Sequence, residues 1–132
     1  MNMSKKLNLK NVIFTGYLPE EKLIELYQRS HVFVCASKTE TQGIVTLEAM
    51  SYRCPVIVSN SLGFKDFVKN NVNGILCNRS EEFVEKIIEI TTNKKLRRKI
   101  TKNGYKTAQK YTIDKCARKL EDVYEGLTGG KK

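Results

Sequence analysis

Two glutamates stand on either side of a glycine in segment 36–58, which reads ASKTETQGIVTLEAMSYRCPVIV. Gly43 allows a ligand to approach the backbone closely, and an apolar, helix-like stretch begins directly after it. The amides in the first turn of a helix have no partner within the helix, and the helix dipole adds positive potential around them. The segment therefore predicts a pyrophosphate site, since such helix ends bind phosphate groups. The amides concerned belong to Gly43, Ile44, Val45 and Thr46.

The two carboxylates could bind the other parts of such a ligand. Glu48 lies about one turn into the helix, where a carboxylate can accept two hydrogen bonds from a ribose diol, as the acidic residue of dinucleotide folds does. Glu40 lies in the preceding loop, where it could accept hydrogen bonds from the hydroxyls of a sugar attached to the phosphate. A solvated helix that carries two acids has the same spacing, so the prediction depends on the elements that flank the glutamates.

Short apolar segments on both sides of the glutamates have the pattern of strands. They are 11–16 (NVIFTG), 31–37 (HVFVCAS), 55–59 (PVIVS) and 74–77 (GILC). Helical patterns separate them at 19–30, at 43–52 and, in a short form, at 66–69. Strands that alternate with helices predict an α/β fold with a parallel sheet. Parallel sheets bind ligands at the carboxyl ends of their strands, which directs attention to the loops after Gly16, Ser37 and Ser59.

The rest of the chain is predicted to be helical. Ser80, which two glutamates follow, begins one helix, and Asn93 caps the next. The helix predicted at 113–127 has one apolar face, made of Ile113, Cys116, Ala117, Leu120, Val123, Tyr124 and Leu127. The chain length fits a single domain, 1–132, with 128–132 as a flexible tail.

Glu40 and Glu48, with seven residues between them in ETQGIVTLEAM and followed by PVIVS, resemble the E-x7-E motif of group 1 retaining glycosyltransferases. The resemblance runs from about Asn11 to Leu127. It implies the GT-B architecture of two facing Rossmann-like domains, of which this chain would be part of the C-terminal, nucleotide-sugar-binding half.

The resemblance also implies roles for individual residues. Glu48 holds the donor ribose, Glu40 contacts the transferred sugar as the catalytic residue, and the backbone of Gly43, Ile44 and Val45 meets the phosphates. Thr39 and Gln42 complete the donor site, in a TETQG string similar to that of glycosyltransferases that make glycolipids on the membrane face. Neither a cofactor nor a metal is expected, and the nucleoside diphosphate sugar is the donor substrate.

The sequence departs from the family pattern in three ways. Arg53 stands where a glycine usually allows a left-handed helix end, at a cost of about 1 kcal/mol. After PVIVS, Gly63 matches the second of two glycines, whereas Leu62 replaces the first and Asp66 replaces a glutamate. Two strand–helix units and a whole acceptor domain would precede 11–16, so we expect an incomplete domain that is inactive alone.

This expectation affects the predicted sheet. The family strand order is 3-2-1-4-5-6, and in it two strands lie between 11–16 and 31–37. Without them we expect about four parallel strands, with 11–16 paired directly to 31–37, and an exposed edge that favours a homodimer. A separate chain that supplies the acceptor domain is the other expected partner.

Charge and composition limit which binding partners and which cellular compartment we expect. The net charge is +10 and the pI about 9.5, a surplus that attracts anions. Segment 94–110 is very basic and could touch an anionic membrane surface, or it could be a solvated helix face. Nucleic acid is not expected, because no aromatic residues interleave with these charges. No apolar run approaches the 18 residues that a membrane-spanning helix needs, and no apolar stretch of signal-peptide length follows the basic N-terminal residues. We therefore expect a cytoplasmic protein, peripheral to the membrane.

The sequence leaves three functions in competition. The first is the donor-binding domain of a glycosyltransferase that moves a sugar, with retention, onto a lipid or polysaccharide. The alternative is a non-catalytic interaction or membrane-surface module derived from such an enzyme, and a weaker third is a basic nucleic-acid binder. The cysteines are expected to be reduced residues that pack as small hydrophobes. They are Cys35, Cys54, Cys77 and Cys116.

Overall fold

The computed structural model describes residues 2–127, so the tail predicted at 128–132 lies outside the described residues. Its centre is a parallel sheet with strands in the order β1-β2-β3. The strands are β1 (Phe33–Cys35), β2 (Val56–Ser59) and β3 (Ile75–Cys77). The helices are α1 (Asn2–Lys6), α2 (Glu20–Arg29), α3 (Ile44–Ser51), α4 (Leu62–Lys65), α5 (Ser80–Thr92), α6 (Lys94–Ala108) and α7 (Ile113–Leu127). Strands alternate with helices up to β3, as predicted.

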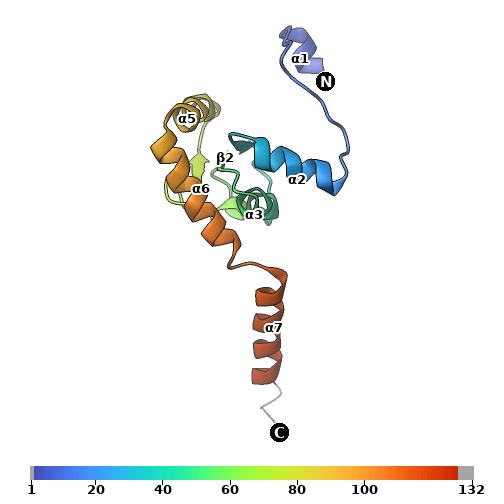
Figure 1. Cartoon of the computed structure of the whole chain (residues 1–132), viewed down its shortest axis with the longest axis vertical. Coiled ribbons are helices and arrows are strands. Elements are labelled where there is room, and N and C mark those ends of the chain that lie inside the picture. The colour runs from blue at the N-terminus through green and yellow to red at the C-terminus, as the bar shows by residue number, and fades with distance from the viewer. Residues whose placement is uncertain (1, 128–132) are drawn as a thin grey trace.

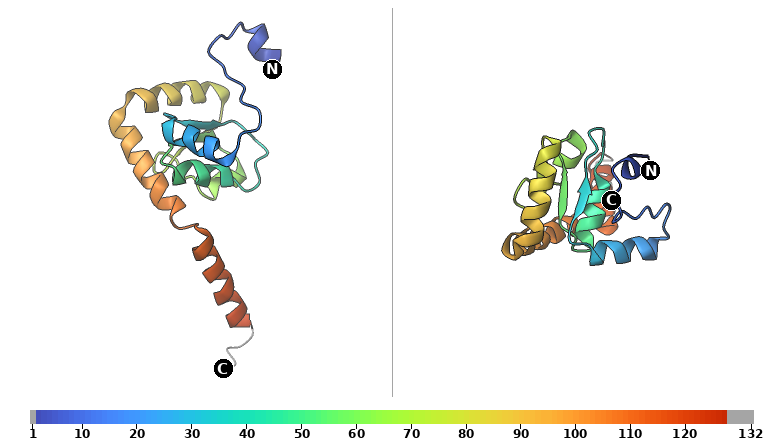
Figure 2. Two further views of the ribbon diagram at one scale, coloured as in Figure 1. Left: turned by 45° about the vertical axis from the view of Figure 1, so that its right-hand side comes forward. Right: turned by 90° about the horizontal axis from the view of Figure 1, so that it is seen from above.

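Helices cover both faces of β2, which is buried along its whole length. Side chains alternate between the faces of a strand, so Val56 and Val58 point to one face and Ile57 to the other. Figure 2 shows the sheet between α5 on one side and α2 and α3 on the other. The short middle strand therefore carries the core, as expected for a parallel sheet.

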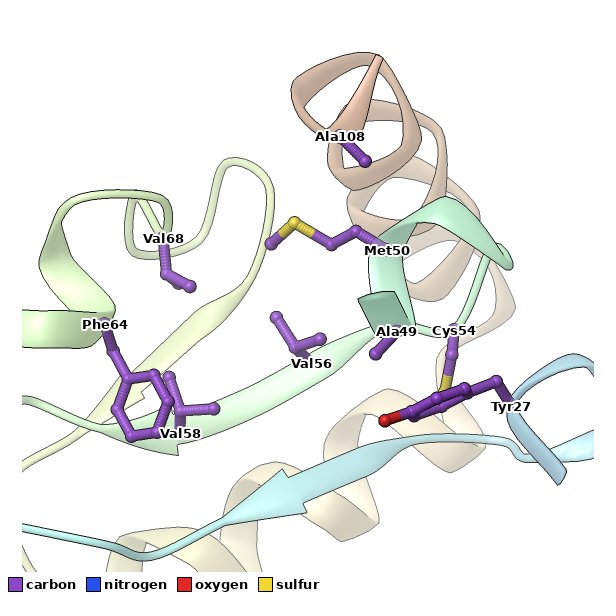
Figure 3. Close-up of a cluster of buried hydrophobic side chains, with 9 residues drawn as sticks. All are labelled: Tyr27, Ala49, Met50, Cys54, Val56, Val58, Phe64, Val68 and Ala108. Carbon is purple, nitrogen blue, oxygen red and sulfur yellow. The ribbon is translucent and has the colours of Figure 1, made fainter. Parts of the chain in front are cut away.

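The two sides of the sheet form two apolar clusters. Figure 3 shows the first, where Tyr27 from α2, Met50 from α3 and Phe64 from α4 meet the valines of β2. In the second, Ile90 of α5 and Ile100 of α6 pack on β2 and β3. Because Ala108 belongs to the first cluster and Ile100 to the second, α6 links the helices on both sides of the sheet.

Local sequence signals explain where several helices begin and end. The Asn93 side chain accepts a hydrogen bond from the Leu96 amide at 2.9 Å, which confirms Asn93 as the cap of α6. At the end of α3, the Arg53 amide donates to the Met50 carbonyl and the Cys54 amide to the Ala49 carbonyl. These two bonds define a Schellman motif, and Arg53 occupies its left-handed position with φ 61°.

The prediction of a fourth strand at 11–16 is wrong. Within the described residues the sheet has three strands, and 11–16 is an irregular segment that pairs with none of them. Ile13 is 87% exposed and Phe14 57% exposed, so the segment buries little apolar surface. It was predicted to pair with the free edge of β1, where Val34 is itself 40% exposed. Burial there is too small to offset the entropy lost when a chain segment is ordered.

Three further differences concern helices. The short helix predicted at 66–69 occurs earlier, as α4, because Gly63 and Phe64 pack into the core. Helix α1 is not predicted by the sequence pattern. Helix α7 forms as predicted, but it projects away from the body and its apolar face is uncovered, with Ile113 87% and Leu127 78% exposed (Figure 1).

Candidate functional site

The predicted site lies in the loop 36–43 and the first turns of α3, at the carboxyl end of β1. Glu40 folds back onto this loop. Its Oε1 accepts hydrogen bonds from the Gly43 amide at 3.0 Å and from the Gln42 amide at 3.3 Å. Thr39 and Gln42 expose their side chains to solvent. Glu40 therefore fixes the shape of the loop that leads into α3.

Two of the four predicted amide donors remain free at the N-terminus of α3. The Gly43 amide is engaged by Glu40, and the Thr46 amide donates to the Gly43 carbonyl at 2.9 Å. The buried Thr46 hydroxyl donates to the same carbonyl at 2.6 Å. Within the described residues the Ile44 and Val45 amides have no protein acceptor. The structure thus presents two adjacent donors at the positive end of a helix.

Two glycines allow the loop to approach α4. Gly43 has a left-handed backbone with φ 64°, and a Cβ on it would overlap the carbonyl oxygen of Gly63. A Cβ on Gly63 would in turn overlap the carbonyl oxygen of Glu40. The close fit between 40–43 and the start of α4 therefore requires glycine at both positions. This contact gives Gly63 a structural role that the sequence pattern alone does not show.

Glu48 lies one turn along α3 from Ile44, and its carboxylate is exposed. Its Oε2 accepts a long hydrogen bond, 3.4 Å, from the Tyr27 hydroxyl of α2. Burial, together with the nearby Glu48 carboxylate, raises the pKa of Tyr27 to about 12, so its phenol stays protonated and donates at neutral pH. The Tyr27 ring stacks on Tyr52, with centroids 6.0 Å apart and planes 7° from parallel. This stack places the hydroxyl beside the Glu48 carboxylate.

Sequence reasoning missed Tyr27 as a member of the site. The spacing of apolar residues places Tyr27 on the buried face of α2, which the structure confirms. Its hydroxyl meets a partner 21 positions further along the chain, and no local pattern shows such a contact.

A polar depression of about 280 Å³ lies beside this site, at the carboxyl ends of all three strands. It is lined by Lys38, Ser59, Asn60, Ser61, Cys77 and Asn78. The Asn60 side-chain amide donates to the Asn78 side-chain oxygen at 2.7 Å. Ser61 Oγ is buried and has no partner among the described residues. The loops after Ser37 and Ser59 were expected at a ligand site, whereas Asn78 was not singled out.

The thiols near the sheet take no part in an ionised cluster. Burial raises the pKa of Cys54 to about 11 and also raises the pKa of Cys77. Both are buried free thiols, as predicted, whereas Cys116 is exposed on α7.

Within residues 2–127 no group of three or more His, Cys, Asp or Glu side chains could hold a metal ion. No helix in the same range is long and apolar enough to cross a membrane.

Comparison with known proteins gives a consistent result. The family model "Glycosyl transferases group 1" matches residues 1–107. The chain is 33% identical over 124 residues to the alpha-monoglucosyldiacylglycerol synthase of Acholeplasma laidlawii, covering 94% of this chain and 31% of that protein. It spans about a third of the length of the curated relatives that it matches.

Solved structures have the same fold. The C-terminal domain of a group 1 family glycosyl transferase from Francisella tularensis matches with a TM-score of 0.74 and 30% identity, over 85% of this chain and 60% of that one. Anabaena HepE, solved in complex with UDP-glucose, matches with a TM-score of 0.84 and 22% identity, over 95% of this chain and 35% of that one.

Proposed function

The chain belongs to the group 1 glycosyltransferases, and we propose that it binds the nucleoside diphosphate sugar that such an enzyme uses as its donor. The predicted family, and the predicted α/β fold of a GT-B C-terminal domain, are confirmed by the comparisons. The donor site itself is our proposal. The observation that carries it is the pair of free amides, Ile44 and Val45, at the N-terminus of α3 between two glutamate carboxylates.

The diphosphate is proposed to bind at these two amides. Both point from the first turn of an eight-residue helix, where the helix dipole also favours negative charge. Gly43 contributes through its missing side chain, which leaves the backbone open to the phosphates. Glu48 lies about 6 Å further along the helix axis, four residues at 1.5 Å each. That offset allows its exposed carboxylate to accept the hydroxyls of the ribose.

Glu40 is proposed to contact the transferred sugar. Its Oε1 is held by two backbone amides, which leaves Oε2 to accept hydrogen bonds from sugar hydroxyls. The sugar would extend toward the polar depression lined by Asn60 and Asn78. The exposed side chains of Thr39 and Gln42 are proposed to complete the donor site. When the bond to the sugar breaks, the departing diphosphate gains negative charge, which the α3 amides stabilise. We propose transfer with retention, without a metal or cofactor.

The acceptor and the partners are also proposals. A lipid acceptor is supported by the relative named for synthesis of a glucosyldiacylglycerol, and a polysaccharide remains the second candidate. The basic helix α6 supports contact with an anionic membrane surface, as expected of a cytoplasmic, peripheral protein. An acceptor domain must face the donor site for transfer, because both substrates have to be held together.

The non-catalytic interaction module is the second candidate, and one observation favours it. The chain exposes apolar side chains at both of its described ends, on segment 9–17 and on α7. Such surfaces are typical of regions that another protein part covers. In this second candidate function, the part that covers them is a partner protein or a second copy of this chain.

The deciding experiment is an NMR titration of the full chain with UDP-, GDP- and ADP-sugars. We expect one of these donors to shift the amide signals of Gly43–Glu48 and to leave those of α5 unchanged. Glu48→Gln should abolish most of the effect, because a neutral amide offers one acceptor oxygen in place of two charged ones and the charge-assisted hydrogen bonds to the ribose are lost. Glu85→Gln, an exposed glutamate on α5, is the matched control.

Two results would count against the proposal. In the first, no donor shifts the α3 signals at millimolar concentration, and the interaction module then becomes the better reading. In the second, Glu85→Gln weakens binding as much as Glu48→Gln, which would show that the carboxylate acts only through net charge.

A further inference from the structure

A second depression, of about 510 Å³, lies at the opposite end of the sheet from the donor site. His31 and Pro55 in its wall precede β1 and β2, so the depression sits at the amino ends of these strands. The end of α2, the turn between α3 and β2, and one face of α6 enclose it. Its lining is rich in basic side chains, which belong to Arg29, His31, Arg53, Arg97, Arg98 and Lys102. We refer to it as the basic pocket.

The charge of the basic pocket is almost uncompensated. Arginine and lysine dominate its lining, which includes neither aspartate nor glutamate. Arg29 is paired with Glu25 at 3.0 Å. Among the described residues, none of the ion pairs involves Arg53, Arg97, Arg98 or Lys102. A concave surface lined by one sign of charge concentrates the potential and attracts counter-ions.

Two of the guanidinium groups are held in place before any ligand arrives. Arg97 Nη1 donates to the carbonyl of Thr91 at 2.8 Å and to that of Ile90 at 3.4 Å, at the C-terminus of α5. The Arg53 guanidinium lies over the Tyr105 ring, 4.1 Å from its centroid. A stacked guanidinium keeps its N–H edges free, and those edges match the oxygens of a phosphate.

The backbone of Arg53 is an independent indication. Its φ of 61° is the left-handed position that closes α3, where glycine is accommodated at lower cost. Such an unfavourable backbone often marks a functional side chain. Here it carries the guanidinium from the α3–β2 turn into the basic pocket.

We propose that the basic pocket binds a phosphate group. Arg53, Arg97 and Arg98 would surround it with charged N–H donors, and Lys102, one turn from Arg98 on α6, would add a point charge. The phosphate has two chemical sources, free inorganic phosphate or the headgroup of an anionic lipid. The site is separate from the proposed donor site, so it does not depend on nucleotide-sugar binding.

The test compares two double variants of α6 that remove the same charge. Arg98→Gln with Lys102→Gln removes two cations from the basic pocket, and Lys95→Gln with Lys106→Gln removes two exposed cations of α6 that lie outside it. The full chain is titrated with inorganic pyrophosphate, and binding is followed by NMR at the arginine side chains and at the backbone amides. Separately, sedimentation measures binding to phosphatidylcholine vesicles with and without phosphatidylglycerol.

We expect pyrophosphate to shift the signals of Arg53 and of residues 97–102. The pocket variant should weaken this binding at least about tenfold, because charge-assisted hydrogen bonds are lost, and the control variant by no more than about twofold. Shifts at Gly43–Glu48 report the donor site and should be the same in both variants. Vesicle binding that needs phosphatidylglycerol and fails only in the pocket variant assigns the phosphate to a lipid, and its absence assigns it to the free anion.

A third variant separates binding from folding. Arg53→Gly keeps the left-handed backbone and should leave Tm within a few degrees of the parent, since relief of the backbone offsets loss of the Tyr105 stack. It should nevertheless weaken pyrophosphate binding. The proposal is overturned if both double variants weaken binding equally, which indicates diffuse attraction to the basic surface. It is also overturned if pyrophosphate shifts only the Gly43–Glu48 signals, or none.

Discussion

Gly63→Ala should damage both the stability of the chain and its donor site. A Cβ at position 63 would overlap the Glu40 carbonyl oxygen and lie 2.7 Å from the carbonyl carbon of Thr41. Because both atoms belong to the backbone, the overlap can be removed only if the loop 40–43 moves away from α4. The φ of Gly63 is not positive, and alanine is therefore unfavourable here because of this contact and not because of its own backbone.

The magnitude follows from two opposing terms. Inserting an atom into a filled position costs about 1–3 kcal/mol. Alanine in place of glycine within a helix stabilises the fold by at most about 1 kcal/mol, through its higher helix propensity. Because the overlapping atoms belong to the backbone, the cost lies at the upper end of that range, and the free energy of unfolding should fall by about 2 kcal/mol and Tm by about 8 °C. The loop shift also displaces Glu40, so the affinity for a nucleotide sugar should fall about tenfold, the loss of one charge-assisted hydrogen bond.

Urea denaturation followed by circular dichroism measures the first effect, and titration calorimetry with the preferred nucleotide sugar measures the second. Gly126→Ala is the control, because a Cβ there meets nothing within 4 Å and should cause no loss. If Gly63→Ala unfolds at the same urea concentration as the parent and binds the donor equally well, the close packing of the loop on α4 is refuted as a requirement.

Two further predictions concern the side chains that shape α3. Burial and Glu48 raise the pKa of Tyr27 from 10.0 to about 12, so the folded chain holds this proton more tightly than the unfolded chain does. The free energy of unfolding should therefore fall as pH rises from about 10 to about 12. Tyr27→Phe should remove that alkaline loss in urea titrations, and it should weaken nucleotide-sugar binding because Glu48 loses its hydrogen-bond donor. Thr46→Val should lower the free energy of unfolding by about 1 kcal/mol, because the buried hydroxyl that donates to the Gly43 carbonyl is lost. An unchanged urea midpoint would contradict this last prediction.

The elements that short-range patterns specify were predicted well. The continuous apolar runs at 55–59 and 74–77 become β2 and β3, because a strand covered on both faces needs apolar residues throughout. The cap at Asn93 also follows from residue type and position, whereas the left-handed turn at Arg53 was expected from the family pattern and not from the residue itself. The cap is fixed by a hydrogen bond that spans only three residues, and the two strands are visible in the sequence as continuous apolar runs.

Features that depend on contacts between residues far apart in the sequence were not predicted. Segment 11–16 has strand-like residues, yet it remains irregular because no sufficiently buried edge receives it. The contacts between Tyr27 and Glu48, and between Gly63 and the Glu40 carbonyl, join residues more than twenty positions apart. Sequence patterns place each of these residues in an element, but they carry no information on which elements meet. The basic pocket has the same origin, since α2, the α3–β2 turn and α6 supply its cations.

The proposed donor site needs little of the fold. Glu40, Gly43, Ile44, Val45 and Glu48 lie within one loop and the first turns of one helix, and Glu40 binds backbone amides of its own loop. The supports outside this segment are the buried strands that anchor α3, the Gly63 contact and Tyr27. All of these supports form in a chain whose sheet has only three strands within the described residues. Loss of pairing at 11–16 therefore leaves the geometry of the site intact, and binding of the nucleotide sugar should be separable from transfer, which also requires a facing acceptor domain.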